Sequence, residues 1–177
     1  MSDAEAAERF VDLVAPHLDE AFALAKWLTG NRADAEDVVQ DACVRALGAL
    51  SGGAVEKPRP WLLAITRNAA HTFLKRNRSR TVVASDDLEA LESASLAEAG
   101  ERPASPEEAL IAAADSQAVE QAIRDLPSAY REVIVMRDIN GLSYREISEA
   151  IEAPIGTVMS RLARGRAALI DKLGRRR

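Results

Sequence analysis

The chain has 177 residues and a formal net charge of −5 at pH 7, a length that suits one ordinary domain or two small ones. Its single cysteine, Cys43, excludes an internal disulfide, and one cysteine with two histidines gives no zinc-ligand spacing. The sequence shows no Gly-rich phosphate loop, nucleophile elbow or signal peptide, and no apolar run near the ~20 residues that span a bilayer. We therefore expect a cytoplasmic protein that is not an enzyme, needs no cofactor or metal and does not insert into a membrane.

The N-terminal segment predicts a scaffold helix from about Ala4 to Thr29, broken or kinked at Pro16 and ended by Gly30-Asn31. Asn31 stands before several acids and is a suitable cap for a second helix, which should reach about Leu50.

In this second helix, polar and apolar positions separate at helical spacing. The positions expected to be buried are Val39, Ala42, Cys43, Ala46 and Leu47, flanked by Val38 and Leu50. The other side carries Asp37, Gln40, Asp41 and Val44. A surface valine beside two acids and a glutamine hints at a protein partner, whereas composition alone favours an ordinary solvated face.

A third helix is expected after Pro58 and Pro60. One of its faces is apolar and carries Leu62, Ile65, Ala69 and Phe73, and another is basic and carries Arg67, His71, Lys75 and Arg78. Trp61, Asn68 and His71 lie near the boundary between the faces. An aromatic ring and polar side chains beside a basic row suit single-stranded nucleic acid, although Trp61 alone is equally typical of a core anchor.

The middle of the chain is acidic and poor in apolar residues, with Pro103, Pro106 and Arg102 as its single base between Thr81 and Glu108. Its acids are Asp86, Asp87, Glu89, Glu92, Glu98, Glu101, Glu107 and Glu108. Such a segment buries little apolar surface and predicts a mobile linker; the alternative is a partly helical connector. Basic residues are instead concentrated between Arg67 and Arg80 and between Arg161 and Arg177, so the net negative charge does not exclude nucleic-acid binding.

The last third of the chain predicts a helix-turn-helix, following a helical pattern opened by Leu126-Pro127. Ser143 and Glu146 form a capping box directly after Gly141, so a short helix should start there. Its expected buried residues are Leu142, Ile147 and Ile151. Pro154 and Gly156 then interrupt the helix.

A second helix should begin at Thr157, with a buried stripe of Val158, Leu162, Leu169 and Leu173. Ser160, Arg161, Arg164 and Arg166 fall largely outside that stripe and suit contacts to phosphates and base edges in a major groove. The alternative is a helical hairpin whose arginines form a solvated face.

Three blocks of sequence, in this order, resemble the bacterial RNA polymerase sigma factors of the extracytoplasmic-function (ECF) group. They run from Asp34 to Asp41, from Trp61 to Asn68, and from Leu126 through Gly141-Leu-Ser-Tyr-Arg-Glu-Ile147 to Leu162. The resemblance implies an all-α protein with sigma region 2 at 1–80, an acidic linker at 81–108 and a helix-turn-helix region 4 at 109–177.

The resemblance also implies partners and site residues. The expected partners are core RNA polymerase, through its clamp helices and flap, promoter DNA and an anti-sigma factor. The polymerase-binding residues would be Asp37, Gln40 and Asp41. The melted −10 element would be bound by Trp61, Arg67, Asn68, His71 and Lys75, where Asn68 matches a position that contacts an extruded base in relatives. The −35 duplex would be bound by Arg145, Thr157, Ser160, Arg161, Arg164 and Arg166.

The chain departs from the family pattern at three positions of the helix-turn-helix. Met159 stands where lysine or arginine is frequent and would lose a phosphate or base contact. Glu152 replaces a frequent glycine, which is tolerable unless that residue needs a positive φ, and Ser148 replaces a frequent alanine.

Two other functions compete with this interpretation. A two-domain helix-turn-helix regulator that acts without joining polymerase would footprint duplex DNA by itself. A protein-interaction module would show no dependence on DNA at any salt concentration.

Overall fold

The computed structural model describes residues 3–78 and 116–174, and the chain divides into two compact units, made mainly of residues 3–78 and mainly of residues 116–174. Within these described ranges the regular structure is helical and no strand occurs, which confirms the expected all-α class. The predicted linker at 81–108 and the basic C-terminal residues 175–177 lie outside the described residues.

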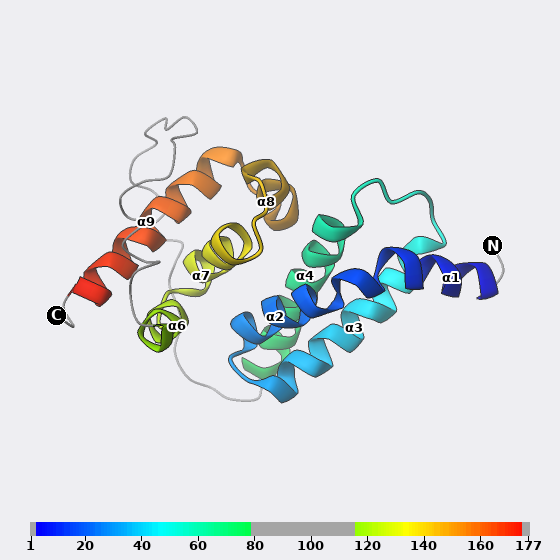
Figure 1. Cartoon of the computed structure of the whole chain (residues 1–177), viewed down its shortest axis with the longest axis horizontal. Helices are drawn as coiled ribbons and strands as arrows, with labels where there is room; N and C mark the ends of the chain where they lie inside the picture. Colours follow the sequence, from blue (N-terminus) through cyan, green and yellow to red (C-terminus); the bar gives the residue numbers. More distant parts are fainter. Residues whose placement is uncertain (1–2, 79–115, 175–177) are drawn as a thin grey trace. The chain divides into compact units, whose positions relative to one another are not determined.

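The first unit is built from four α-helices and one short 3-10 turn (Figure 1). They are α1 (Asp3–Leu13), η1 (Ala15–His17), α2 (Leu18–Thr29), α3 (Arg32–Leu50) and α4 (Pro58–Arg78). The expected break at Pro16 is confirmed, because this proline lies in η1 between α1 and α2. Gly30 ends α2 with a φ of 87°, a left-handed conformation that glycine adopts without strain.

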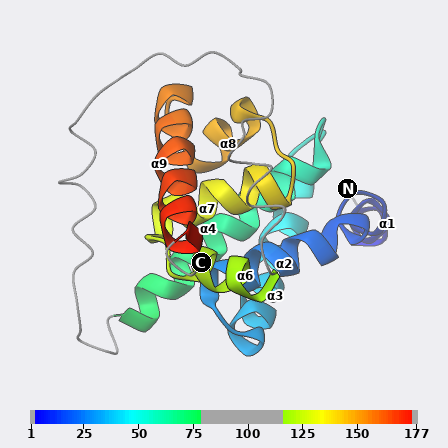
Figure 2. The same ribbon diagram turned by 60° about the vertical axis from the view of Figure 1, so that its left-hand side comes forward.

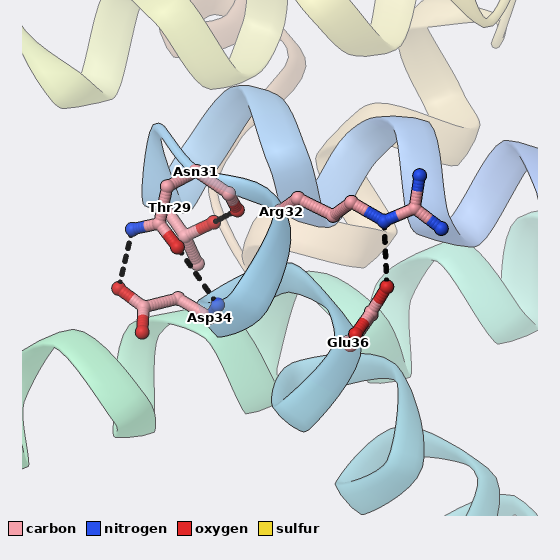
Figure 3. Close-up of polar contacts among 5 residues, drawn as sticks. All are labelled: Thr29, Asn31, Arg32, Asp34 and Glu36. Atoms are coloured by element: carbon pink, nitrogen blue, oxygen red, sulfur yellow. Dashed lines mark hydrogen bonds and ion pairs between the residues drawn. The ribbon is translucent and has the colours of Figure 1, made fainter.

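The cap of α3 determines where the helix starts (Figure 3). The Asn31 side-chain oxygen accepts a hydrogen bond from the Asp34 backbone N–H at 2.9 Å, and its Nδ2 donates to the Asp34 carboxylate at 2.7 Å. Arg32 donates to Glu36 one turn further along, at 2.8 Å. The prediction of an Asn31 cap is therefore confirmed, and a cap of this kind contributes about 1 kcal/mol to helix stability.

Helices α2, α3 and α4 pack against one another, and small side chains at their interfaces allow close approach. The buried alanines are Ala21, Ala25, Ala35, Ala42, Ala46, Ala69 and Ala70. The buried row of α3 runs through Val38, Ala42, Ala46 and Leu50 at four-residue spacing. The buried face of α3 therefore differs from the expected one. Val38 and Leu50, expected at its flanks, lie inside the core, whereas Leu47, expected to be buried, is exposed.

Residues 116–174 of the second unit form four α-helices and one π-helical turn (Figure 2). They are α6 (Ser116–Arg124), α7 (Ser128–Ile134), the π-helical turn η2 (Val135–Ile139), α8 (Tyr144–Ile151) and α9 (Ile155–Gly174). Helix α9 packs against both α6 and α7. A Cβ added to Gly165 of α9 would lie 3.0 Å from the Ile134 side chain, so α7 and α9 cross too closely for most residues at this position.

Helices α8 and α9 form the predicted helix-turn-helix. Ser143 Oγ accepts from the Glu146 backbone N–H at 3.2 Å, and the Glu146 carboxylate accepts from the Ser143 N–H at 2.9 Å, which confirms the capping box. Gly141 has a φ of 68° at the break before it. The expected start of the second helix at Thr157 was two residues late, because α9 begins at Ile155 and Gly156 lies in its first turn.

Glu152 follows the last residue of α8 with a φ of 54°, in the left-handed region that favours glycine. We expect Glu152→Gly to raise the free energy of unfolding by about 1 kcal/mol, because the strain of a Cβ in this conformation exceeds the entropy that glycine adds to the unfolded chain. Urea unfolding of the full chain measures this change. Glu149→Gly is the matched control inside α8 and should instead destabilise by about 1 kcal/mol. Equal destabilisation by both changes would contradict the role of φ.

Candidate nucleic-acid and protein interfaces

One face of α4 brings together four of the five residues assigned to single-stranded DNA. The buried face of this helix carries Leu62, Leu63, Thr66, Ala69 and Ala70. Helical spacing puts Trp61, Asn68, His71 and Lys75 on the opposite side, and we call these four residues the α4 face. Arg67 lies at its edge. Exposure decreases from Asn68 and Lys75, which are exposed, to Trp61 and His71, which are half-buried.

The Asn68 side chain is oriented by its neighbour. Arg67 donates from Nη1 to the Asn68 amide oxygen at 3.1 Å, and Thr72 donates to the Asn68 backbone carbonyl at 3.0 Å. An asparagine amide offers one acceptor and two donors, which is the combination that base edges require. Arg67 therefore supplies positive charge and also fixes the amide that faces away from the core.

The outer side of α3 presents Asp37, Gln40, Asp41 and Val44, here called the α3 strip. All four side chains are exposed, as expected, and Val44 is 71% exposed and lies opposite the buried row of the helix. Asp41 pairs with Arg45 at 2.7 Å one turn further along, an exposed ion pair that contributes little to stability. An apolar side chain surrounded by acids and an amide is typical of a protein interface.

The −35 residues predicted on α9 fall into two groups. Thr157, Ser160 and Arg164 lie away from the buried residues Val158, Leu162 and Leu169, and Ser160 Oγ donates to the Thr157 carbonyl at 3.0 Å. The two other arginines face acids of α7 and of the π-helical turn η2. Arg161 lies 3.7 Å from the Glu132 carboxylate, and Arg166 forms two hydrogen bonds with Asp138 at 2.7 and 3.3 Å.

These two ion pairs bury most of the arginine side chains that take part in them. The Arg161 side chain is 17% exposed and that of Arg166 12%, while Glu132 is 1% exposed. Neither Glu132 nor Asp138 was predicted from the sequence as a partner of these arginines. A signal was present at Glu132, because this acid directly precedes the apolar run from Val133 to Met136.

A second contact that was not predicted from the sequence lies at the start of α8. The Arg137 guanidinium lies over the Tyr144 ring, 4.8 Å from its centroid, and donates to the Leu142 carbonyl at 2.9 Å. The predicted phosphate contact Arg145 follows Tyr144 and is exposed. At the other end of α8, Ser148 donates to the Ala153 carbonyl, so the serine that departs from the family pattern helps to close the turn.

The remaining features of the described residues concern metal sites, a reactive cysteine and membrane-spanning helices. They contain no cluster of three His, Cys, Asp or Glu residues placed to hold a metal ion. Burial raises the pKa of the Cys43 thiol above its ordinary value, in agreement with a packing role. Among the helices of residues 3–78 and 116–174, none has both the length and the apolarity needed to cross a membrane.

The two units match two families of known sequence. Residues 13–80 match Sigma-70 region 2 and residues 116–169 match Sigma-70, region 4. These two regions together define a sigma factor of the sigma-70 family, with one helical domain for each region.

Comparison with whole proteins shows to which group of sigma factors the chain is similar. The chain is 31% identical to the ECF RNA polymerase sigma factor SigW of Bacillus subtilis over 170 residues, which cover 94% of this chain and 89% of SigW. It is 33% identical to the ECF RNA polymerase sigma-E factor of Escherichia coli K12 over 143 residues, covering 79% of this chain and 74% of that protein. The chain therefore belongs to the ECF group of RNA polymerase sigma factors. A helix-turn-helix regulator that acts without polymerase is not favoured.

Solved structures show the same fold. The sigma factor RpoE in a complex from Bartonella quintana superposes with a TM-score of 0.70 at 23% identity, covering 96% of this chain and 99% of that one. The structure of CnrH superposes with a TM-score of 0.62 at 28% identity, covering 97% of this chain and 94% of that one.

Proposed function

We propose that this ECF sigma factor joins core RNA polymerase in the cytoplasm and directs initiation by binding a promoter at two points. Region 2 binds the polymerase clamp helices through the α3 strip and the melted −10 strand through the α4 face. The observation that carries the proposal is that these two surfaces lie on different helices of one domain. The domain can therefore contact polymerase and single-stranded DNA at the same time.

The proposed mechanism consists of binding steps, without bond chemistry by this chain. On the α4 face, Lys75, His71 and Arg67 lie along the phosphate backbone, while Trp61 and Asn68 offer a ring for stacking and an amide for a base edge. Region 4 contacts the −35 duplex and the polymerase flap. Two modest DNA contacts held on one polymerase reinforce each other through effective concentration.

For the −35 duplex, we assign different roles to the residues of α9. Thr157, Ser160 and Arg164 would face the major groove, and Arg145 of α8 would contact a phosphate. Arg161 and Arg166 would orient α9 on the DNA without reading bases themselves, because their ion pairs with Glu132 and Asp138 hold α9 against α7 and η2.

Arg164→Ala should weaken binding of the −35 duplex by about 1–3 kcal/mol if the guanidinium reads a base edge. Filter binding at several salt concentrations, on a duplex and its single-base variants, measures the loss. Arg124→Ala on α6 removes the same charge from the same domain and serves as the control. A similar loss from both variants would mean that Arg164 contributes only net charge, and a uniform loss over all sequences would make it a phosphate contact.

We also propose control by an anti-sigma factor. Support comes from the neighbouring structures, because RpoE was solved with the anti-sigma factor NepR and CnrH with the cytosolic domain of CnrY. A protein that covers the α3 strip would compete directly with polymerase for the same exposed side chains.

Run-off transcription with purified core polymerase and a promoter library tests the proposed function. We expect transcripts that start at defined sites and depend on the added chain. The absence of any promoter-specific transcript over the whole library would overturn the proposal.

A further inference from the structure

Three apolar side chains lie one turn apart along the start of α9: Ile155, Met159 and Ala163, here called the α9 apolar row. Ile155 is 44% exposed, Ala163 is exposed and Met159 is half-buried. The row lies along the side of the helix, between the buried Leu162 and the side chain of Ser160.

Two arginines of α9 contact acids instead of extending this row with free charge. Arg161 lies on another side of the helix and is turned to Glu132 of α7. Arg166 follows Ala163 by three residues on the same side, but its guanidinium is held by Asp138 of η2. The N-terminal half of α9 therefore presents Met159 and Ala163 beside Ser160, with Arg164 as the following basic side chain. An apolar surface of this kind has an unusual composition for a helix that binds a polyanion.

In a helix-turn-helix, the first residues of the second helix contact base edges in the major groove. The apolar group that a base pair presents there is the 5-methyl group of thymine. Methionine suits such a contact, because its unbranched thioether adapts to irregular apolar surfaces.

We propose that Met159 packs on the 5-methyl group of a thymine in the −35 duplex, and that this protein consequently prefers an A·T pair at that position. The inference deepens the proposed function and rests on it. An arginine at this position would select a different partner, because arginine pairs with the O6 and N7 acceptors of guanine.

The test uses holoenzyme made from the full chain and core polymerase, with −35 duplexes that this holoenzyme selects from a randomised library. Each thymine is replaced in turn by deoxyuridine, which lacks only the 5-methyl group. We expect one replacement to weaken binding about fourfold, the effect of losing one buried methyl group. Met159→Ala should bind both duplexes equally, whereas Met159→Leu should keep the difference. Met159→Arg should shift the preferred base at this position to guanine.

The proposal is overturned if no deoxyuridine replacement changes the affinity of the unmodified protein, or if Met159→Ala remains as sensitive as the unmodified protein. In both cases, run-off transcription from the same promoters would still support the sigma function, so the two failures are distinguishable. A further set of duplexes carries 5-methylcytosine in place of each cytosine of the site in turn. If one of these replacements strengthens binding in a way that depends on Met159, and no deoxyuridine replacement weakens it, Met159 contacts a methylated cytosine and the thymine assignment is wrong. Thermal unfolding of each variant verifies that the half-buried side chain has been replaced without loss of fold.

Discussion

Reversing two charges of the α3 strip, with Asp37→Arg and Asp41→Arg together, should lower the affinity for core polymerase about a hundredfold and abolish promoter-dependent transcription. Both carboxylates are exposed and flank Val44, whose side chain is 71% exposed. Reversing charges around an apolar contact adds repulsion to the loss of attraction, and residues at the centre of an interface commonly contribute about 2 kcal/mol or more. The stability of the free chain should hardly change, since the lost Asp41–Arg45 pair is exposed.

Fluorescence anisotropy with labelled protein and core polymerase measures this loss. Glu8→Arg with Asp12→Arg is a matched control, because both residues are exposed on α1 and have the same four-residue spacing and charge change. Equal loss in the control would indicate a nonspecific charge effect. Unchanged affinity of the α3 variant would remove the polymerase assignment from this surface.

Features produced by neighbouring residues were predictable from the sequence. The Asn31 cap and the Ser143–Glu146 capping box each depend on groups three residues apart, so their geometry follows from local sequence. The left-handed conformations of Gly30 and Gly141 have the same origin. For this reason, the helix ends and the helix-turn-helix agree closely with the expectations.

Which face of a helix is buried was harder to predict where the sequence is rich in alanine. In α3, small apolar residues occur on several sides, and the pattern placed Leu47 in the core. The structure selects the row from Val38 to Leu50 because this row meets α2 and α4. Only contacts between helices distinguish these two arrangements, and the sequence of α3 does not contain them.

At the candidate site, the contacts of the α9 arginines could not be predicted from the sequence of α9 for the same reason. Their spacing outside the buried stripe indicated DNA contacts for all of them. The partners Glu132 and Asp138 precede the helix-turn-helix and approach α9 only through the tertiary fold. Tertiary ion pairs thus place the guanidinium groups of Arg161 and Arg166 against acids of α7 and η2, which the sequence of α9 alone does not indicate.

Arg161→Ala should therefore reduce stability before it affects sequence recognition. The change would leave the Glu132 carboxylate, 1% exposed, without this cation, and breaking a buried ion pair costs about 3 kcal/mol. Hydrogen exchange of the α7 amides in the full chain should lose about a hundredfold in protection. Affinity for the −35 duplex should fall by a similar factor on every sequence, with the order of base preferences unchanged.

A double-mutant cycle separates the two possible roles of Arg161. Replacing both partners, with Glu132→Leu and Arg161→Met, removes the buried charges together, and such replacements are often neutral or stabilising. If Arg161 only holds α9, the double variant recovers both the exchange protection and the original −35 preference. If Arg161 reads a base, the double variant recovers protection but loses discrimination at one base pair, and Arg161→Ala alone loses that discrimination as well. The second pattern would return Arg161 to the DNA-reading group beside Arg164, and the first would leave its ion pair with Glu132 as the contact that orients the recognition helix.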